Sequence, residues 1–405
     1  MRLNSDGSVD STFNVGTGFG YTVKVLLRQS DGRILVGGGF HSFNGATVGG
    51  IARLNPNGSL DTGFIAGTGF NDDVLGLAVQ PDGKVIAVGE FITYNGVARN
   101  SIARLDGTTA TLDPTFDPGT GFNHSVQAIE LQSDGKIVVG GWFNTFNGVS
   151  RNSIARLLDT GALDTGFDPG TGFNDEIEGL ALLPSGKIVV GGDFSTYNGT
   201  SIGALARLDT NAALDGTFAP AVGEAGYVYA MAAAPGGRWV IGGQFERVNG
   251  TLCNNLARLN ADGTLDTSFS VGTGTNNWVS SLVVLPDGRV LVGGYFSTYN
   301  GAPAKYIIRL NPDGTPDSTF NTGTGFNWNV NALALQADGR VLVGGRFGTY
   351  NGVSVSTLVR LGPDGALDAA FAPPATGFNG EVYTLLALPE GDIYVGGLFT
   401  TYHGS

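Results

Sequence analysis

The residues best suited to individual chemistry occupy one position of a short motif that returns eight times. Its first copy is Val36-Gly37-Gly38-Gly39-Phe40, and the later copies change mainly in the residue before the phenylalanine. That position holds Gly39, Glu90, Trp142, Asp193, Gln244, Tyr295, Arg346 and Leu398. No single packing role suits acids, a base, aromatic rings and glycine. An individual function is therefore expected at this position.

A second variable set lies just before, or at the start of, the first predicted strand of each repeat. It consists of the pairs Tyr21-Thr22, Asp72-Asp73, His124-Ser125, Asp175-Glu176, Gly226-Tyr227, Asn277-Trp278, Trp328-Asn329 and Gly380-Glu381. Because a tight turn joins the first two strands, the start of one lies beside the end of the other. We therefore expect both sets on one face, and strand ends on a rigid scaffold often carry recognition.

Aromatic side chains in these sets predict a binding surface. Trp142, Trp278 and Trp328 fall in variable positions, whereas Trp239 replaces a core aliphatic residue. Exposed rings make good anchors for sugars or for protein partners. The ligand-binding candidates are Trp142, Trp278, Tyr295, Trp328, Glu90, Asp193 and Arg346. The alternative to a binding surface is neutral sequence drift, in which duplicated repeats diverge at every position where packing tolerates a change.

Acids in the same sets suggest two further kinds of chemistry. The residues Asp72, Asp73, Asp175, Glu176, Glu178 and Glu381 are candidates for holding Ca²⁺, which prefers several oxygen ligands. A solvated acidic rim is the simpler interpretation, so we expect no cofactor. Carboxylate pairs could also cleave a glycosidic bond. Neither G-x-S-x-G nor H-E-x-x-H occurs, and His41, His124 and His403 lie in different repeats, so no catalytic residue is predicted.

Four short strands in each repeat must position these residues. In the second repeat the expected strands are 74–80, 84–91, 101–106 and 112–116, separated by turn sequences such as Pro81-Asp82-Gly83. Four antiparallel strands in about 51 residues are typical of a β-propeller blade. We predict an all-β, eight-bladed propeller forming one domain over 1–405, with first strands near residues 22, 74, 125, 177, 228, 279, 330 and 382.

The two ends of the chain complement each other. The last repeat stops after Phe399 and a short tail, without a third or fourth strand, while residues 1–13 match the third and fourth strands at 52–64. We therefore expect residues 1–13 to complete the eighth blade. Pairing of this kind closes the ring and removes exposed sheet edges, which promote aggregation.

An arginine and an aspartate recur in all eight repeats. The arginines are Arg2, Arg53, Arg104, Arg156, Arg207, Arg258, Arg309 and Arg360, and the aspartates are Asp10, Asp61, Asp113, Asp164, Asp215, Asp266, Asp317 and Asp368. A buried arginine needs a partner. The repetition predicts eight structural ion pairs rather than eight catalytic sites.

Composition excludes several classes of partner. The 22 basic and 35 acidic residues give a formal charge of −13, which repels nucleic acid and anionic membranes. No apolar run is long enough to cross a bilayer, and no signal peptide precedes the first repeat. The single cysteine, Cys253, has no internal partner and is expected to be a semi-buried thiol. We expect a monomer.

The repeat resembles the bacterial delta-60 repeat over the whole chain. The likeness lies in I-A-R-L-N-x-D-G-x-L-D-x-x-F followed by Q-x-D-G-K-I-x-V-G-G-x-F. This resemblance implies a β-propeller within a large secreted or surface-attached bacterial protein, and it brings no catalytic residues. The fifth repeat departs most, with 221–227 replacing G-T-G-F-N and Val248 replacing a tyrosine.

The leading hypothesis is a non-catalytic binding or adhesion module on the bacterial surface or outside the cell, which recognises a glycan or a protein through its varied face. The alternatives are a carbohydrate-active enzyme, a hydrolase or lyase with acids at the mouth of the channel, and a structural spacer with no ligand.

Overall fold

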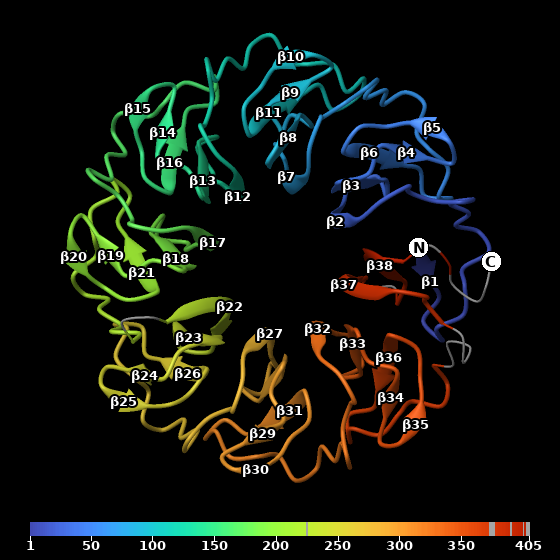
Figure 1. Cartoon of the computed structure of the whole chain (residues 1–405), viewed down its shortest axis with the longest axis vertical. Coiled ribbons are helices and arrows are strands. Elements are labelled where there is room, and N and C mark those ends of the chain that lie inside the picture. The colour runs from blue at the N-terminus through green and yellow to red at the C-terminus, as the bar shows by residue number, and fades with distance from the viewer. Residues whose placement is uncertain (224–225, 372–376, 389–390, 400, 402–405) are drawn as a thin grey trace. The chain divides into compact units, whose positions relative to one another are not determined.

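The computed structural model describes residues 1–405 except 224–225, 372–376, 389–390, 400 and 402–405. His403 and part of the divergent stretch 221–227 therefore lie outside the described residues. All the regular elements within the described ranges are β-strands, which confirms the all-β prediction (Figure 1). The chain divides into unit 1, Met1–Ser11 with Thr217–Ser405, and unit 2, Thr12–Gly216. Within the described residues each unit holds four three-stranded antiparallel sheets, and each of these sheets forms the body of one blade.

The four blades of unit 2 have the same three-stranded order, in which the second strand is central. Their first strands are β2 (Val23–Arg28), β7 (Val74–Val79), β12 (Val126–Leu131) and β17 (Ile177–Leu182). The second strands are β3 (Ile34–Gly38), β8 (Val85–Gly89), β13 (Ile137–Gly141) and β18 (Ile188–Gly192). The third strands are β6 (Ile51–Leu54), β11 (Ile102–Leu105), β16 (Ile154–Leu157) and β21 (Leu205–Leu208).

Unit 1 repeats this arrangement. Its first strands are β22 (Tyr227–Ala234), β27 (Val279–Val284), β32 (Val330–Leu335) and β37 (Glu381–Ala387), and its second strands are β23 (Arg238–Gln244), β28 (Val290–Gly294), β33 (Val341–Gly345) and β38 (Ile393–Leu398). The third strands are β26 (Leu256–Leu259), β31 (Ile307–Leu310), β36 (Leu358–Leu361) and β1 (Arg2–Leu3). In β1, Arg2 lies opposite Tyr394 and Leu3 opposite Ile393. The N-terminus therefore completes the eighth blade, as predicted; closure of all eight blades into one ring stays a prediction.

Two details of the blade differ from the expected four strands. The fourth strand is reduced to a single bridge, such as Leu54 with Leu60. A small hairpin also lies between the second and third strands, with a turn whose asparagine has positive φ, for example 48° at Asn95. Asparagine and glycine tolerate this conformation better than other residues. The hairpins are β4 (Ser42–Phe43) with β5 (Ala46–Thr47), β9 (Thr93–Tyr94) with β10 (Val97–Ala98), β14 (Thr145–Phe146) with β15 (Val149–Ser150), β19 (Thr196–Tyr197) with β20 (Thr200–Ser201), β24 (Arg247–Val248) with β25 (Thr251–Leu252), β29 (Thr298–Tyr299) with β30 (Ala302–Pro303), and β34 (Thr349–Tyr350) with β35 (Val353–Ser354).

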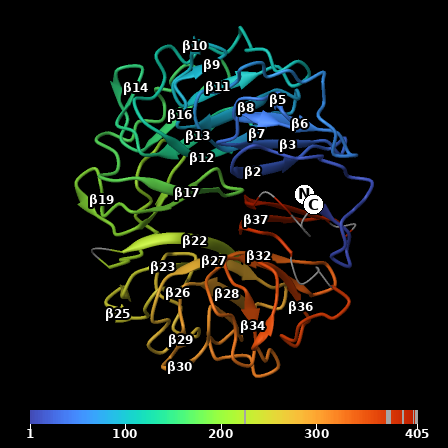
Figure 2. The same ribbon diagram turned by 45° about the vertical axis from the view of Figure 1, so that its right-hand side comes forward.

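Consecutive blades within each unit pack through their first strands. In unit 2, β7 contacts both β2 and β12, and in unit 1, β32 contacts both β27 and β37 (Figures 1 and 2). The first glycine of the repeated motif makes this approach feasible. A Cβ added to Gly242 would lie 2.4 Å from a methyl group of Val279 in the next blade. The glycine thus allows the close approach of the next blade, and in the second repeat, where Val88 takes its position, Gly76 of the first strand leaves room for the valine side chain.

The predicted ion pairs are present in every blade. The arginine Nε donates to the aspartate Oδ2 at 2.6–2.8 Å in all eight repeats. Six of the guanidinium groups also lie 4.5–4.9 Å from the centre of a phenylalanine ring. Buried charge is tolerated here because the arginine has both a carboxylate and an aromatic face as neighbours.

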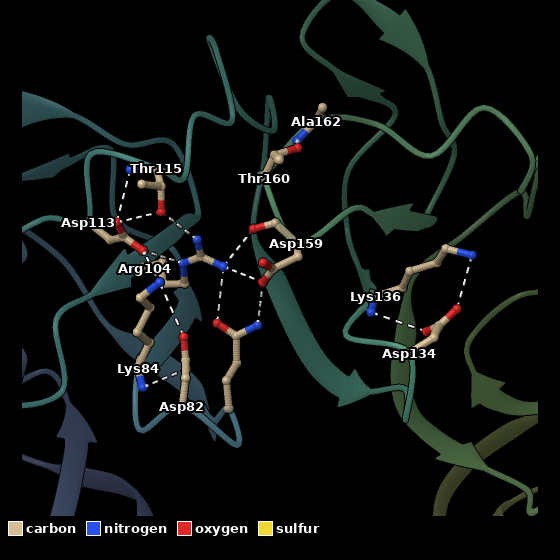
Figure 3. A network of polar contacts seen from close by, with 11 residues as sticks. Asp82, Lys84, Arg104, Asp113, Thr115, Asp134, Lys136, Asp159, Thr160 and Ala162 are labelled. Carbon is tan, nitrogen blue, oxygen red and sulfur yellow. Dashed lines mark hydrogen bonds and ion pairs between the residues drawn. The ribbon is translucent and has the colours of Figure 1, made fainter.

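The same arginines also hold neighbouring blades together. Arg104 donates to the carbonyl oxygen of Asp159, in the next blade, at 2.6 Å and to Thr115 Oγ1 at 3.0 Å (Figure 3). Arg156 and Arg258 reach main-chain carbonyls of the following blades at 2.6 and 2.7 Å. One buried side chain therefore fixes the turn of its own blade and the turn of the next.

Replacing Arg258 by Met should strongly destabilise the protein. Asp266 would lose its buried partner, and breaking such a pair typically costs about 3–5 kcal/mol. The matched control is Arg238→Met, because Arg238 contacts the same aspartate at 3.2 Å but its side chain is 43% exposed rather than 7%. We expect the control to lose at most about 1 kcal/mol. Equal losses in urea unfolding would contradict the structural role of the buried arginine.

The eight pairs also predict loss of stability in acid. Burial by itself would raise the pKa of Asp113, but hydrogen bonds from Thr115 and the charges of Lys84 and Arg104 hold it well below the usual 3.8. The pKa of Asp317 is lowered in the same way by Thr319, Arg289 and Arg309. A carboxylate with a depressed pKa stabilises the fold above its unfolded pKa, and that stability is lost as the pH falls. The melting temperature should therefore fall as the pH drops below about 4; a melting temperature that keeps its neutral-pH value throughout this acid range would contradict this assignment.

Candidate ligand-binding face

A β-bulge at the start of each first strand brings the two variable sets together. The register shifts there by one residue, as between Val279 and Ser281. The residue before the motif phenylalanine then donates its N–H to the carbonyl of the variable residue that opens the first strand. Tyr295 bonds Trp278 at 2.9 Å, Asp193 bonds Glu176 at 3.0 Å and Glu90 bonds Asp73 at 2.9 Å. The prediction that both variable sets share one face is therefore confirmed within each blade.

Four aromatic side chains form a continuous cluster on this face of unit 1, here called the aromatic row: Tyr227, Tyr229, Trp278 and Tyr295. Tyr227 and Tyr229 are stacked with their ring centres 6.0 Å apart. Tyr229 meets Trp278 edge-on at 6.2 Å, and Trp278 lies 5.7 Å from Tyr295. Tyr229, Trp278 and Tyr295 are each about 40% exposed, at 38%, 41% and 40%. The row spans two blades and remains accessible to a ligand.

A charged segment lies next to the aromatic row in the following blades. The Arg346 guanidinium lies 5.6 Å from the centre of the exposed Trp328 ring and 3.3 Å from Glu381. Desolvation, and then the negative charge of Glu381, raise the pKa of Tyr295. Four of the predicted binding residues of unit 1, Trp278, Tyr295, Trp328 and Arg346, therefore lie on one surface with Glu381.

Unit 2 presents a different, largely acidic surface at the equivalent positions. Trp142 is exposed and lies against His124, with ring centres 4.9 Å apart. Glu90 is exposed, and Asp73 is paired with Lys24 at 2.7 Å. Desolvation, and then the charges of Glu176 and Asp175, raise the pKa of Asp193 to about 6. In unit 2 the aromatic candidate Trp142 is thus accompanied by the acidic candidates Glu90 and Asp193, whereas unit 1 has several aromatic side chains in contact.

Glu178 shares the acidic surface of unit 2. Desolvation of its carboxyl, followed by repulsion from Glu176 and Asp193, raises its pKa to about 7. Among the residues that the structure describes, no three His, Cys, Asp or Glu side chains form a group suited to a metal ion. Of the proposed Ca²⁺ ligands, Asp72, Asp73, Asp175 and Glu176 belong to unit 2, where Asp73 is paired with Lys24, and Glu381 is paired with Arg346 in unit 1.

Two residues outside the variable sets lie in the interior. Trp239 is buried in β23, as its core position predicts. Cys253, expected to be semi-buried, is fully buried, and desolvation raises the pKa of its thiol to about 11, which makes it a poor nucleophile.

Sequence reasoning missed Tyr229 and Tyr383, which are both exposed on first strands. Each lies two residues after a residue of the variable pairs, Tyr227 and Glu381 respectively. Side chains two residues apart in a strand share a face, so this period was the available signal.

Comparison with known families supports the architecture. A family model matches residues 1–13, 29–64, 80–116, 132–167, 183–218, 235–269, 285–320 and 336–371, which together make up more than half of the chain. The chain belongs to the family described as domain of unknown function (DUF5122) beta-propeller. This membership confirms a propeller-forming repeat. No curated protein sequence matches the chain.

Solved structures support the same fold. The Dos1 propeller matches with a TM-score of 0.54 and 12% identity, over 98% of this chain and 94% of that chain. PorZ, a bacterial surface component of the type-IX secretion system of Porphyromonas gingivalis, gives 0.47 and 14% over 93% of this chain and 52% of its own. The extracellular domain of BT4673 from B. thetaiotaomicron gives 0.43 and 15%, over 95% and 50%. The chain spans about half the length of these two chains. In the part that the structure describes, no helix is long and apolar enough to cross a membrane.

Replacing Glu178 by Gln should stabilise the protein in alkaline but not in acidic solution. A carboxyl with a raised pKa stabilises the fold below its unfolded pKa, about 4.5, and loses that stability as the pH rises through about 7. We expect a higher melting temperature than wild type at pH 8 and no difference at pH 4. Glu90→Gln is the control, because Glu90 and Glu178 are both exposed acids of unit 2 but Glu90 belongs to another blade from Glu176 and Asp193. Identical pH profiles for wild type and Glu178→Gln would contradict the crowding of these carboxyls.

Proposed function

We propose that this chain is a non-catalytic glycan-binding module that holds its ligand on the aromatic row of unit 1. The observation that carries the proposal is the contact between Tyr229, Trp278 and Tyr295, whose rings come from two blades and remain exposed. Contiguous exposed apolar surface on a soluble protein commonly marks an interaction site. Neutral drift of the repeat sequences does not by itself explain why these three rings are in contact.

A sugar suits this surface better than a flat apolar partner. Aromatic rings bind the apolar faces of sugars, and the Tyr hydroxyls and Trp N–H supply hydrogen bonds at their edges. The neighbouring Arg346 and Glu381 add charged hydrogen-bonding groups. A protein ligand is the competing class, and the binding assay below distinguishes the two.

We further propose that the module belongs to a secreted or surface-attached bacterial protein. This placement rests on the resemblance to the delta-60 repeat, together with a net charge of −13 that disfavours nucleic acid as a partner. No cofactor is needed for binding of this kind.

A carbohydrate-active enzyme is the second candidate, and one observation favours it. Glu178 and Asp193, in the blade that follows the exposed Trp142, have pKa values raised to about 7 and 6. A carboxylic acid that stays protonated near neutral pH is what a general acid requires. Glycan breakdown that is lost in both Glu178→Gln and Asp193→Asn would favour this candidate over simple binding.

The test of the binding proposal is a glycan array followed by calorimetry with the whole chain. We expect Trp278→Ala to weaken binding of the selected glycan by about tenfold or more. A central aromatic side chain that becomes covered by the ligand commonly contributes about 1.4 kcal/mol or more to binding. The control is Ile65→Ala, since Ile65 is 67% exposed and is not part of the aromatic row. Unchanged affinity in Trp278→Ala, or binding that depends only on Trp142, would refute the assignment to unit 1.

A further inference from the structure

A hollow of about 270 Å³ lies at the seam between the third and fourth blades of unit 2. Its walls come from the third blade and from the segment 173–175, which leads into β17 (Figure 1). The polar and exposed side chains of the lining include His124, Trp142, Asn144, Asn152, Ser153 and Asp175. The volume is close to the lower end of the range for ligand pockets, about 300 Å³, so the hollow suits a small ligand.

The hydroxyl of Ser153 is an unsatisfied polar group in this lining. Ser153 is only 4% exposed, and its Oγ has no hydrogen-bond partner among the described residues. The matching Ser101 of the second blade has nearly the same φ, 62° against 63°, but its Oγ donates to the carbonyl of His124 at 2.8 Å. A buried hydroxyl without a partner costs free energy. The free hydroxyl of Ser153 therefore indicates a binding site rather than a gap in packing.

Two further oxygen atoms of the lining are available to a donor. The Nδ2 of Asn152 donates to the carbonyl of Thr171 at 2.6 Å, and its Oδ1 accepts no hydrogen bond from the described residues. Asp175 is exposed and accepts the N–H of Glu176 at 2.9 Å through Oδ1, which leaves Oδ2 available. With the hydroxyl of Ser153, the hollow offers three acceptors, and one of them is a carboxylate.

An exposed tryptophan and nearby acids make this hollow attractive to a cation. Trp142 is 55% exposed, although His124 lies against its ring. The face of an indole ring attracts cations more strongly than other aromatic side chains do. The lining residues include no lysine or arginine, and Asp193 interacts with the charges of Glu176 and Asp175 nearby. The local charge therefore favours a positively charged ligand.

We propose that this hollow binds the protonated primary amine of a small organic ligand, such as an amino sugar. A primary ammonium group has three N–H donors, which matches the acceptors on Asn152, Ser153 and Asp175. Its positive charge suits the carboxylate of Asp175 and the ring of Trp142. The inference goes beyond the proposed function, because the hollow belongs to unit 2 and shares no residue with the aromatic row.

The experiment is an NMR titration of the whole chain at pH 7, followed through the indole N–H signals of its four tryptophans. Glucosamine should bind at least about tenfold more tightly than N-acetylglucosamine, which keeps the ring but lacks the charge, because a charge-assisted hydrogen bond is commonly worth such a factor. Cadaverine, a primary diamine without a sugar ring, identifies the source of the amine. Affinity for cadaverine equal to that for glucosamine supports recognition of the amine alone, and a preference for glucosamine supports an amino sugar.

Variants of the lining test the three acceptors and the ring. Asp175→Asn removes the charge and keeps the shape, so it should weaken glucosamine binding about tenfold. The matched control is Asp72→Asn, since Asp72 holds the same position in the second blade and accepts the N–H of Asp73 at 2.8 Å but is not part of the lining. Ser153→Ala should weaken binding without lowering the melting temperature, because its hydroxyl has no partner to lose. Trp142→Leu should weaken binding by removing the aromatic face.

Several results would overturn this site. They are equal affinity for glucosamine and N-acetylglucosamine, no binding of either amine, and unchanged glucosamine binding in both Asp175→Asn and Ser153→Ala. Trp278→Ala should keep the wild-type affinity for glucosamine, and loss of amine binding in that variant would also overturn the site. Failure of the amine site leaves the aromatic row untouched, because the glycan assay with Trp278→Ala tests the proposed function separately.

Discussion

The buried arginine of the third strand is the interaction on which the rest of each blade depends. A guanidinium group has five N–H donors and cannot lose its charge, so it must be satisfied where it lies. In this chain the aspartate eight or nine residues later takes one side of the group, a phenylalanine covers its face, and a main-chain carbonyl of the next blade takes the far end, as at Arg104 and Arg258. The turn sequences recur because they carry the aspartate, the phenylalanine and the main-chain carbonyl that contact the arginine.

This constraint leaves the opposite edge of each blade free to vary. The bulge at the start of the first strand ties the two variable positions through main-chain hydrogen bonds, so this link places no demand on the residue type at either position. The two units have used this freedom differently. Unit 1 carries Tyr229, Trp278 and Tyr295, whereas unit 2 carries Glu90, Glu176 and Asp193. Stacked aromatic rings make the surface of unit 1 apolar, whereas crowded carboxyls make that of unit 2 negatively charged. The surface of unit 1 is therefore suited to binding an uncharged ligand.

The sequence by itself determined the architecture of the blade. The turn signals and the arginine with its aspartate are encoded locally and recur eight times at a period of about 51 residues. The completion of the last blade by residues 1–13 follows from the complementary ends of the chain. The fourth strand was less predictable, since only one bridge such as Leu54 with Leu60 remains of it. Two-residue hairpins such as β9 with β10 are too short for a hydrophobic pattern to reveal.

The tertiary structure alone decided which variable residues meet. Tyr229 and Trp278 lie 49 positions apart, and their contact depends on how one blade stacks on the next. The sequence identified Trp278 and Tyr295 as candidates but did not show that Tyr229 contacts Trp278 or that Trp142 lies apart from them. Local pattern specifies the scaffold, whereas a site between blades exists only after they have packed.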